Sequence, residues 1–493
     1  MAINEKKRDI PYANASPSKY FFCHMLTRDI ELKDAIMDLM DNCVDGAMRQ
    51  KGNPPSIEDD SYYKGYRIDI ELTNNKFTIK DNCGGIPKKI AEEYAFRFGR
   101  PENLPEENRL PTIGLYGIGM KRAIFKIGTD AVVHTKTIDD GEYSVAIPCD
   151  WIQTDTWSFS MTNGEGNVHH ETGTTIIVNL KNNISEFSKE KLPDFIQSLM
   201  KDVASNFGLI IHKGLEITIN KKLIKGVDIS FVVDEHPVKD RKRYLPYIYS
   251  AIVDGVDVFM VLGFYRREIL PSEDDIDEEL KGGGRQRTSE KAGWTIVCND
   301  RIVLYNNKDH LTGWGEFGIP KYHTQFIGIK GIVYFNSSNP SLLPTTTSKR
   351  GIDLNSELYA SVKKRMCMAL KNFIDYTNKW KGKEDEEKRQ SSKSKLMDVR
   401  DLIKNKNNFE RFLDVKLKNV SRPNEKERDA VIFIPDLPLP KENVVSKRIS
   451  FLVEVEEYDD VAEYLFDDDA ESTKPAEVGK KCFNMILNMA RKQ

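Results

Sequence analysis

The sequence predicts an α+β fold, in which helices and mainly antiparallel strands follow one another without a regular alternation. Residues 34–47 carry apolar side chains at helical spacing, which predicts an amphipathic helix near the start of the chain. Residues 66–80 alternate apolar and polar side chains on either side of Asn74-Asn75, which predicts a β-hairpin. Short strand-like runs follow between residues 130 and 180 with no helical pattern between them, as in an antiparallel meander.

Composition limits the classes of protein that fit this chain. It has 493 residues, enough for about three domains, and 39% of them are hydrophobic, so sizeable cores can form. The net charge of -3 carries no global nucleic-acid signature, so any DNA contact would come from local basic clusters. The 7 cysteines include no C-x-x-C pair, which favours a reducing compartment and argues against a zinc site. Because no apolar run reaches membrane-spanning length, we expect a cytoplasmic protein without membrane association.

The helix predicted at residues 34–47 carries two different stripes. Its apolar stripe, which would face a core, consists of Ile36, Leu39, Met40, Cys43 and Ala47. Asp38, Asn42 and Asp45 form a second stripe at positions i, i+4 and i+7. A solvated acidic face usually alternates with lysine or arginine, yet this span contains neither residue. Two alternatives stay open, a solvated surface or a stripe that holds a metal ion or positions a water.

A glycine pair follows the predicted hairpin. Asp81 ends the second strand, and Gly84-Gly85 come soon after it. Pro87 is well placed as the first residue of a helix expected at residues 88–98. The pattern therefore places a carboxylate at the end of a strand, directly before a glycine turn and a helix.

A second glycine loop lies further along the chain. Residues 99–113 form a long loop rich in proline and glutamate, which suggests a lid. Gly114, Gly117 and Gly119 then precede a helix that has Lys121 just inside it. Glycines before a helix let backbone N–H groups approach a phosphate, and the helix N-terminus favours the negative charge. The spacing G-x-x-G-x-G is weak evidence by itself.

The remaining elements are predicted from the same patterns. Further strands of the first part are expected at residues 130–137, 142–148, 156–161 and 174–180, with a helix at 186–206. The second part is expected to contain strands at 249–253, 256–264, 294–305 and 325–335 and a helix at 356–380. The tail is expected to contain a charged stretch at 383–396, a strand at 449–455, an acidic segment at 456–471 and a final helix.

Together, in this order and at these separations, the motifs resemble the nucleotide-binding fold of the GHKL ATPases. This superfamily contains gyrase B, the large heat-shock chaperones, MutL, the MORC proteins and the histidine kinases. The resemblance covers roughly residues 21–380 and implies a Bergerat-type ATP-binding α/β sandwich followed by an α/β transducer domain and a small C-terminal domain. We expect an N-terminal arm at 1–20, the ATP-binding domain at 21–230, the transducer domain at 231–382, a charged linker at 383–410 and a partner-binding domain at 411–493.

The resemblance assigns roles to five residues around the metal and the adenine. Asn42 matches the family asparagine that binds the Mg²⁺ ion bridging the ATP phosphates. Asp38 matches the general base that activates water, and Asp81 matches the aspartate that binds the exocyclic amine of adenine. Gly85 matches a glycine of the D-x-G-x-G motif beside the base, and Thr174 matches the threonine near adenine.

The remaining assignments concern the phosphates. Gly114, Gly117 and Gly119 match the phosphate loop, and Lys121 matches a lysine that MORC-like members carry just after it. Lys349, in a Thr-Ser-Lys loop of the second domain, resembles the transducer lysine that reaches the γ-phosphate in gyrase and MutL.

Two departures from the family pattern affect the expected chemistry. Cys83 stands where the first D-x-G-x-G glycine is expected, which changes the backbone beside the adenine. Asp38 stands where these ATPases usually have glutamate, so its carboxylate reaches roughly 1 Å less far, and a misplacement of about 1 Å can cost on the order of 10²-fold in rate. We therefore expect ATP binding with slow hydrolysis.

The resemblance also suggests two classes of function. The runs 293–301, 312–314 and 344–351 are closest to MORC-like ATPases. They imply an ATP-dependent homodimer that acts as a clamp on double-stranded DNA or on a DNA-associated partner, in defence against foreign DNA. The alternative is a nucleotide-gated dimerisation switch or chaperone-like module that recruits a protein partner through the C-terminal domain with little hydrolysis.

Overall fold

The computed structural model describes most of the chain. The described residues are 18–98, 117–164, 171–181, 184–234, 242–271, 288–346, 349–405, 409–420, 427–440, 449, 452–467, 470 and 473–491. The lid-like loop at 99–113, Gly114 and nearly all of the expected N-terminal arm lie outside these residues. The chain separates into two compact units, residues 1–440 and 441–493, and each is described by itself.

The first part of the larger unit is built on an eight-stranded sheet with the order β5-β4-β3-β6-β2-β1-β7-β8. Its strands are β1 Arg67–Leu72, β2 Lys76–Asp81, β3 Gly128–Thr137, β4 Gly141–Ile147, β5 Ser160–Asn163, β6 Gly173–Leu180, β7 Glu216–Ile219 and β8 Lys222–Leu223. The expected hairpin is confirmed, because β1 and β2 pair in antiparallel register with Ile70 opposite Ile79. β1 also pairs in parallel with β7, which joins the hairpin to the end of the domain.

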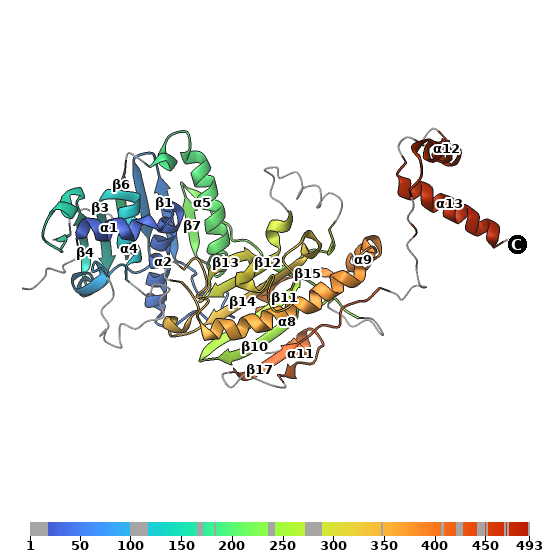
Figure 1. The fold of residues 1–493 in the computed structure, drawn as a ribbon. Helices are drawn as coiled ribbons and strands as arrows, with labels where there is room; N and C mark the ends of the chain where they lie inside the picture. Colours follow the sequence, from blue (N-terminus) through green and yellow to red (C-terminus); the bar gives the residue numbers. More distant parts are fainter. Residues whose placement is uncertain are drawn as a thin grey trace, which may run out of the picture. The chain divides into compact units, whose positions relative to one another are not determined.

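Helices pack against this sheet and position the predicted site (Figure 1). They are α1 Lys19–Arg28, α2 Leu32–Lys51, α3 Lys88–Ile90, α4 Gly119–Ile127, α5 Leu192–Asn206 and α6 Gly208–His212, with short helical turns η1 Ala91–Ala95, η3 Cys149–Gln153 and η4 Ser185–Phe187. The predicted apolar stripe of α2 is buried, since Ile36, Met40 and Ala47 are 0% exposed. α2 ends at Gly52, whose φ of 73° is the left-handed conformation that glycine adopts readily at a helix C-terminus.

A seven-stranded sheet with the order β13-β12-β14-β11-β10-β17-β16 forms the second part of this unit. Its strands are β10 Tyr247–Val253, β11 Val256–Phe264, β12 Gly293–Cys298, β13 Arg301–Asn307, β14 Ile329–Asn336, β16 Lys418–Asn419 and β17 Glu427–Phe433. The long helix α8, Glu357–Trp380, covers one face and contributes to one core cluster with Val333 (Figure 1). α10 Val399–Lys404 and α11 Phe409–Phe412 contribute to the other cluster, which contains Ile332.

Several predicted elements differ from those observed. The single strand predicted at 294–305 is wrong, because Asn299 and Asp300 adopt φ of 45° and 66° and form a tight turn between β12 and β13. The helix predicted at 88–98 consists of only α3 and the π-helical η1. The strand predicted at 156–161 begins at Ser160, and the main helix predicted from 186 begins at Leu192.

The end of the larger unit lies beyond the expected domain boundary. Residues 383–410, expected to be a linker, contain α9 Glu384–Ser391, α10 and β15 Lys395–Asp398, which pairs with β9 Ser230–Val233. β17 then adds to the second sheet beside β10, and the compact unit ends at Pro440. The structure therefore divides the chain at 440 rather than at 383 or 411. A division near residue 230 remains a proposal.

α9 is held by a buried carboxyl group. Glu387 is 1% exposed and accepts hydrogen bonds from the hydroxyls of Tyr376 at 2.9 Å and Tyr244 at 3.2 Å. Burial raises the pKa of Glu387 from 4.5 to about 7. The segment that joins α8 to the second sheet therefore depends on a carboxyl group whose protonation changes near neutral pH.

The smaller unit consists of two helices in its described part, α12 Val455–Phe466 and α13 Pro475–Ala490. The strand predicted at 449–455 is wrong, because residues 452–454 form no strand and Val455 begins α12. The expected mixed α/β fold class is confirmed by the two sheets and their helices. No helix in the part of the chain described above is both long and apolar enough to cross a membrane.

Candidate functional site

The acidic stripe of α2 faces into the protein. Asp38 and Asp45 are each 4% exposed, and Asp41 is 1% exposed, whereas Asn42 is half-buried. The alternative of a solvated acidic face therefore does not hold. Because removing a carboxylate from water is costly unless it is paired, each buried aspartate should have a cation or hydrogen-bond donor beside it. The cation-free span of α2 has to obtain these partners from other elements.

Asp38 obtains its partner from α4. The Arg122 Nη2 atom lies 2.5 Å from Asp38 Oδ2 in a largely buried ion pair. The backbone of Gly119 also faces this carboxylate, since a methyl group at Gly119 would lie 3.6 Å from Oδ2. Burial raises the pKa of Asp38 above its ordinary value, and the charges of Lys349 and Arg122 oppose this rise. The expected general base therefore lies beside the expected phosphate loop.

Asp41, one residue before Asn42, connects α2 to the second sheet. Its Oδ1 accepts from Arg301 Nε at 2.8 Å, and its Oδ2 lies 3.2 Å from Lys349 Nζ. Burial would raise the pKa of Asp41, but the charges of Arg301 and Lys349 hold it below its ordinary value. The Arg301 guanidinium also lies 4.2 Å from the centre of the Phe207 ring. Two cations from distant parts of the chain therefore converge on one carboxylate of α2.

Lys349 lies within the acidic stripe. Only 12% of its side chain is exposed, and its backbone has a φ of 56°. Burial would lower the pKa of Lys349, but Asp41, Asp45 and Asp38 together raise it above its ordinary value. The structure thus brings the predicted Lys349 close to the predicted Asp38, although its direct contact is with Asp41.

Two buried nitrogen atoms at this site have unfilled hydrogen-bonding capacity. Among the residues that the structure describes, Asn42 Nδ2 and Arg122 Nε are buried and have no hydrogen-bond partner. Buried polar atoms are nearly always paired in native proteins, so an unpaired one calls for a ligand or water. The Asn42 amide also carries an oxygen, the kind of ligand that Mg²⁺ prefers. The residues present therefore fit a magnesium–phosphate group.

Asp81 and Thr174 are joined directly at the other end of α2. Asp81 Oδ1 accepts from the backbone N–H of Cys83 at 2.7 Å and from that of Thr174 at 3.3 Å. Burial raises the pKa of Asp81, and the hydrogen bond from the Cys83 backbone is the largest effect that opposes this rise. A methyl group at Gly173 would lie 2.0 Å from the Asp81 carbonyl oxygen, so the two strands meet where only glycine fits. The carboxylate is rigidly fixed at the end of β2.

The glycine turn after Asp81 also requires its glycines. Gly84 and Gly85 have φ of 93° and 75°, and a methyl group at Gly85 would lie 2.2 Å from the Lys136 carbonyl oxygen. Cys83, the departure from the family pattern, is 1% exposed. Its carbonyl oxygen approaches Gly46 of α2, where a methyl group would lie 2.7 Å from it. Gly46 therefore gives the room that the Cys83 turn needs against α2.

The Lys121 side chain is buried against the backbone and does not project as a ligand-binding lysine would. It is 2% exposed, and its ammonium donates to the Ala95 carbonyl oxygen at 2.8 Å and to that of Gly117. Burial lowers the pKa of Lys121 to about 8. Gly117 has a φ of 65°, and Gly119 begins α4. Lys121 therefore links the glycine turn at Gly117 to Ala95 of η1 through hydrogen bonds.

The sequence reasoning missed three residues of the site, namely Arg122, Asp41 and Arg301. Arg122 directly follows Lys121, and Asp41 directly precedes Asn42, but neither was assigned a role. Asp41 and Arg301 are separated by 260 positions, so no local pattern links them. The available signal was the absence of lysine and arginine from residues 34–47, which implies that the carboxylates of this span find partners elsewhere.

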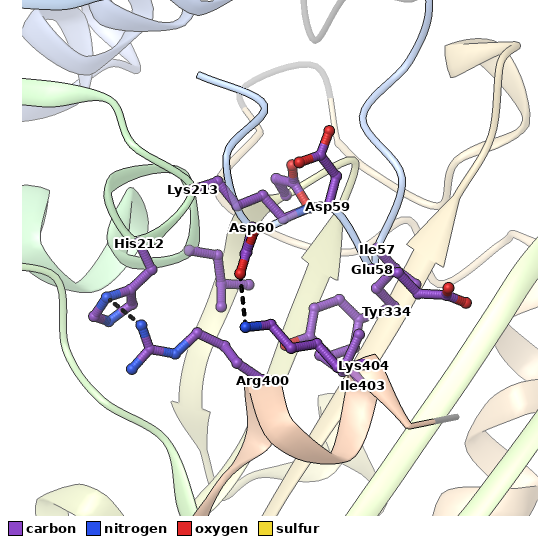
Figure 2. Close-up of a pocket in the computed structure, with 12 residues that line it drawn as sticks. Ile57, Glu58, Asp59, Asp60, His212, Lys213, Tyr334, Arg400, Ile403 and Lys404 are labelled. Atoms are coloured by element: carbon purple, nitrogen blue, oxygen red, sulfur yellow. Dashed lines mark hydrogen bonds and ion pairs between the residues drawn. The ribbon is translucent and has the colours of Figure 1, made fainter. Parts of the chain in front are cut away.

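A separate small cleft lies where the 57–60 loop, α6 and α10 meet. Figure 2 shows Lys404 reaching Asp60 and Arg400 reaching His212 across this cleft. Beneath it Asp300, the residue before Arg301, forms a buried ion pair with Lys213 at 2.6 Å. The cleft contains none of the predicted site residues. The adjacent residues Asp300 and Arg301, at the β12–β13 turn, therefore both form ion pairs with the first part of the chain.

One family model matches the part of the chain that contains most of these residues. Residues 30–164 match a family model described as "Histidine kinase-, DNA gyrase B-, and HSP90-like ATPase". No curated protein matches the chain. The matched segment includes α2, the Asp81 turn and the start of α4. The family match supports a GHKL-type ATPase domain over residues 30–164.

Proposed function

We propose that this chain binds Mg·ATP at the acidic stripe of α2 and hydrolyses the nucleotide slowly. The observation that carries the proposal is the buried Asp38 and the unpaired amide of Asn42, one helical turn apart beside Gly119. A carboxylate, an amide with open hydrogen bonds and a glycine turn at a helix N-terminus suit a magnesium–phosphate group. GHKL domains generally bind ATP with Mg²⁺, and the family match supports the same chemistry here.

In this proposal the adenine end of the site is formed by Asp81. Two backbone N–H groups occupy its Oδ1 atom and fix the orientation of the carboxylate. A fixed carboxylate can accept a hydrogen bond from the exocyclic amine of adenine and discriminates against a base that lacks this donor. Gly84 and Gly85 have no side chains, so the backbone of this turn could lie close to the base.

The phosphates would lie between α2 and the start of α4. Asn42 would hold Mg²⁺ through its amide oxygen, and the bound ion would neutralise charge that develops on the phosphates. The backbone N–H groups at Gly119 and after it begin a helix of nine residues, so they favour the negative charge of a phosphate. Lys121 would act by holding this turn rather than by direct contact.

Asp38 would accept a proton from the attacking water. Its raised pKa suits a general base, because a carboxylate in a buried site is more basic than one in water. Arg122 occupies Oδ2, whereas Oδ1 makes no hydrogen bond to any residue that the structure describes. Turnover would be slow for two reasons, since aspartate is shorter than glutamate and Arg122 stabilises its charged form.

We further propose that ATP closes a MORC-like homodimeric clamp that acts on DNA or on a DNA-associated partner in defence against foreign DNA. Lys349 would leave Asp41 for the terminal phosphate and so report its presence to the second sheet. α1 has a face with Tyr20, Phe21 and Met25 exposed by 69%, 58% and 55%, which suits packing against a second copy.

A nucleotide-gated switch with little hydrolysis is the second candidate function. The ion pair between Asp38 and Arg122 favours it, because a base held by a cation accepts a proton less readily. The smaller unit favours it too, because Phe483, Ile486 and Met489 on α13 are 53%, 63% and 58% exposed, as expected for a surface that binds a protein partner.

One experiment separates the two functions. ATP turnover by the full chain is measured with and without double-stranded DNA, and its size is measured with a non-hydrolysable ATP analogue. A clamp predicts dimerisation with the analogue and faster turnover with DNA, with a stimulation that falls as salt rises. A switch predicts the same dimerisation with negligible turnover that DNA does not change. A chain that stays monomeric with the analogue contradicts both.

A further inference from the structure

Arg122 has more hydrogen-bonding capacity than its contact with Asp38 uses. Its Nη2 atom is engaged by Asp38 Oδ2 at 2.5 Å, whereas its Nε–H is buried without a partner among the described residues. A buried donor left unpaired is costly, so a bound partner would relieve this cost. The Arg122 side chain as a whole is 17% exposed.

A second unpaired donor lies on α2. Asn42 Nδ2, one helical turn after Asp38, is also buried without a partner in the described part of the chain. Two unfilled donors, one on Arg122 beside Asp38 and one on the next turn of α2, suit a polar anionic group that completes the site.

We propose that Arg122 contacts the terminal phosphate of bound ATP with its unfilled donors while its Nη2 atom keeps hold of Asp38. The inference rests on the proposed function and deepens it, because it assigns selectivity for ATP over ADP to a residue of the same polypeptide. A guanidinium presents five N–H donors in a planar fork, so it can join a carboxylate and a phosphate at once. It would thereby fix the short Asp38 side chain relative to the phosphate that the water attacks.

The other cations of the site are less suited to this contact in the structure. Lys121 is committed to two backbone carbonyl oxygens, and Lys349 would have to leave Asp41 before it could reach a phosphate. Arg122 has a buried N–H with no partner, and it lies directly beside the expected base. An arginine beside the transferred phosphate stabilises charge that is absent from ADP, so its removal should affect ATP selectively.

The test compares dissociation constants for Mg·ATP and Mg·ADP in the full chain, measured by calorimetry. The variants are Arg122→Gln, Arg122→Lys and the double variant Arg122→Gln/Asp38→Asn, which leaves no unpaired buried charge. Lys126→Ala is the matched control, because Lys126 lies on the same helix but donates to the Thr27 carbonyl oxygen. Circular dichroism and melting curves check that each variant is folded.

We expect Arg122→Gln and the double variant to weaken ATP binding by about ten- to a hundredfold and to leave ADP binding within about threefold of wild type. Arg122→Lys should restore only part of the preference, since an ammonium lacks the fork geometry. Lys126→Ala should bind both nucleotides as the wild type does. An equal loss for ATP and ADP in the folded double variant would overturn the inference and make Arg122 a structural partner of Asp38. Failure of the wild type to bind either nucleotide would refute the proposed function, and this inference with it.

Discussion

Arg301 and Asp41 form an ion pair that joins the second sheet to α2, and the substitution Arg301→Met tests its contribution to stability. Both side chains are 1% exposed, and Arg301 Nε lies 2.8 Å from Asp41 Oδ1. Removing one partner of a buried pair costs about 3–5 kcal/mol, because the other charge stays buried without compensation. Lys349 remains on Asp41 Oδ2 at 3.2 Å, so we expect the lower end, about 3 kcal/mol.

The assay is a double-mutant cycle in which the stability of each full-length variant is measured by urea unfolding. Asp41→Asn should cost a similar amount, since Arg301 would keep only the carbonyl oxygens of Asn206 and Ile302. The double variant should be more stable than the sum of the single losses predicts, by about 2 kcal/mol. Lys404→Met is the control, because its pair with Asp60 has side chains 46% and 57% exposed and solvent screening should leave it with little effect on stability.

Additivity within about 0.5 kcal/mol in this cycle would refute the reasoning, because it would mean that the two charges do not stabilise each other. A loss in Lys404→Met as large as that in Arg301→Met would also refute it, since burial would then not decide the energetics.

Three further predictions follow from the same structure. The pKa of Glu387 is about 7 in the folded state, against 4.5 ordinarily. The stability that comes from its protonated carboxyl group is therefore fully present below pH 4.5 and is lost as the pH rises through 7. In urea unfolding over that range, the wild type should lose about 3 kcal/mol of stability relative to Glu387→Gln. Gly173→Ala should abolish ATP binding in calorimetry by forcing a methyl group 2.0 Å from the Asp81 carbonyl oxygen, whereas Gly479→Ala, where a methyl group would meet no atom within 4 Å, should retain it; equal behaviour of the two would contradict the packing. Lys349→Met should lower kcat by about 10²-fold with little change in ATP affinity, and an unchanged kcat would remove Lys349 from the reaction.

Local patterns were sufficient for the elements that carry the site. The helical spacing of Ile36, Met40 and Ala47 predicted α2, and the alternation around Asn74-Asn75 predicted the β1–β2 pair. These features depend on interactions between near neighbours, so the sequence expresses them directly. The β12–β13 hairpin was missed because Asn299-Asp300 sits within a continuous run of strand-like residues, where the turn signal is short.

The partners of the buried carboxylates could not be predicted in the same way. Asp38 pairs with Arg122 across 84 positions, and Asp41 pairs with Arg301 across 260. Such pairs form only after the sheets have brought distant segments together, and a single sequence contains many arginines that would serve equally well. The sequence could indicate that α2 needed cations from elsewhere, but it did not indicate which ones.

Nucleotide binding at α2 is tested most directly by a calorimetric titration of the full chain with Mg·ATP. We predict saturable binding of one nucleotide per chain. The affinity should fall by at least about tenfold in Asn42→Ala, and it should be retained in Asp38→Asn, which should lose only turnover. Absence of binding to the wild type, or binding that Asn42→Ala leaves unchanged, would contradict the assignment of α2 as the magnesium–nucleotide helix.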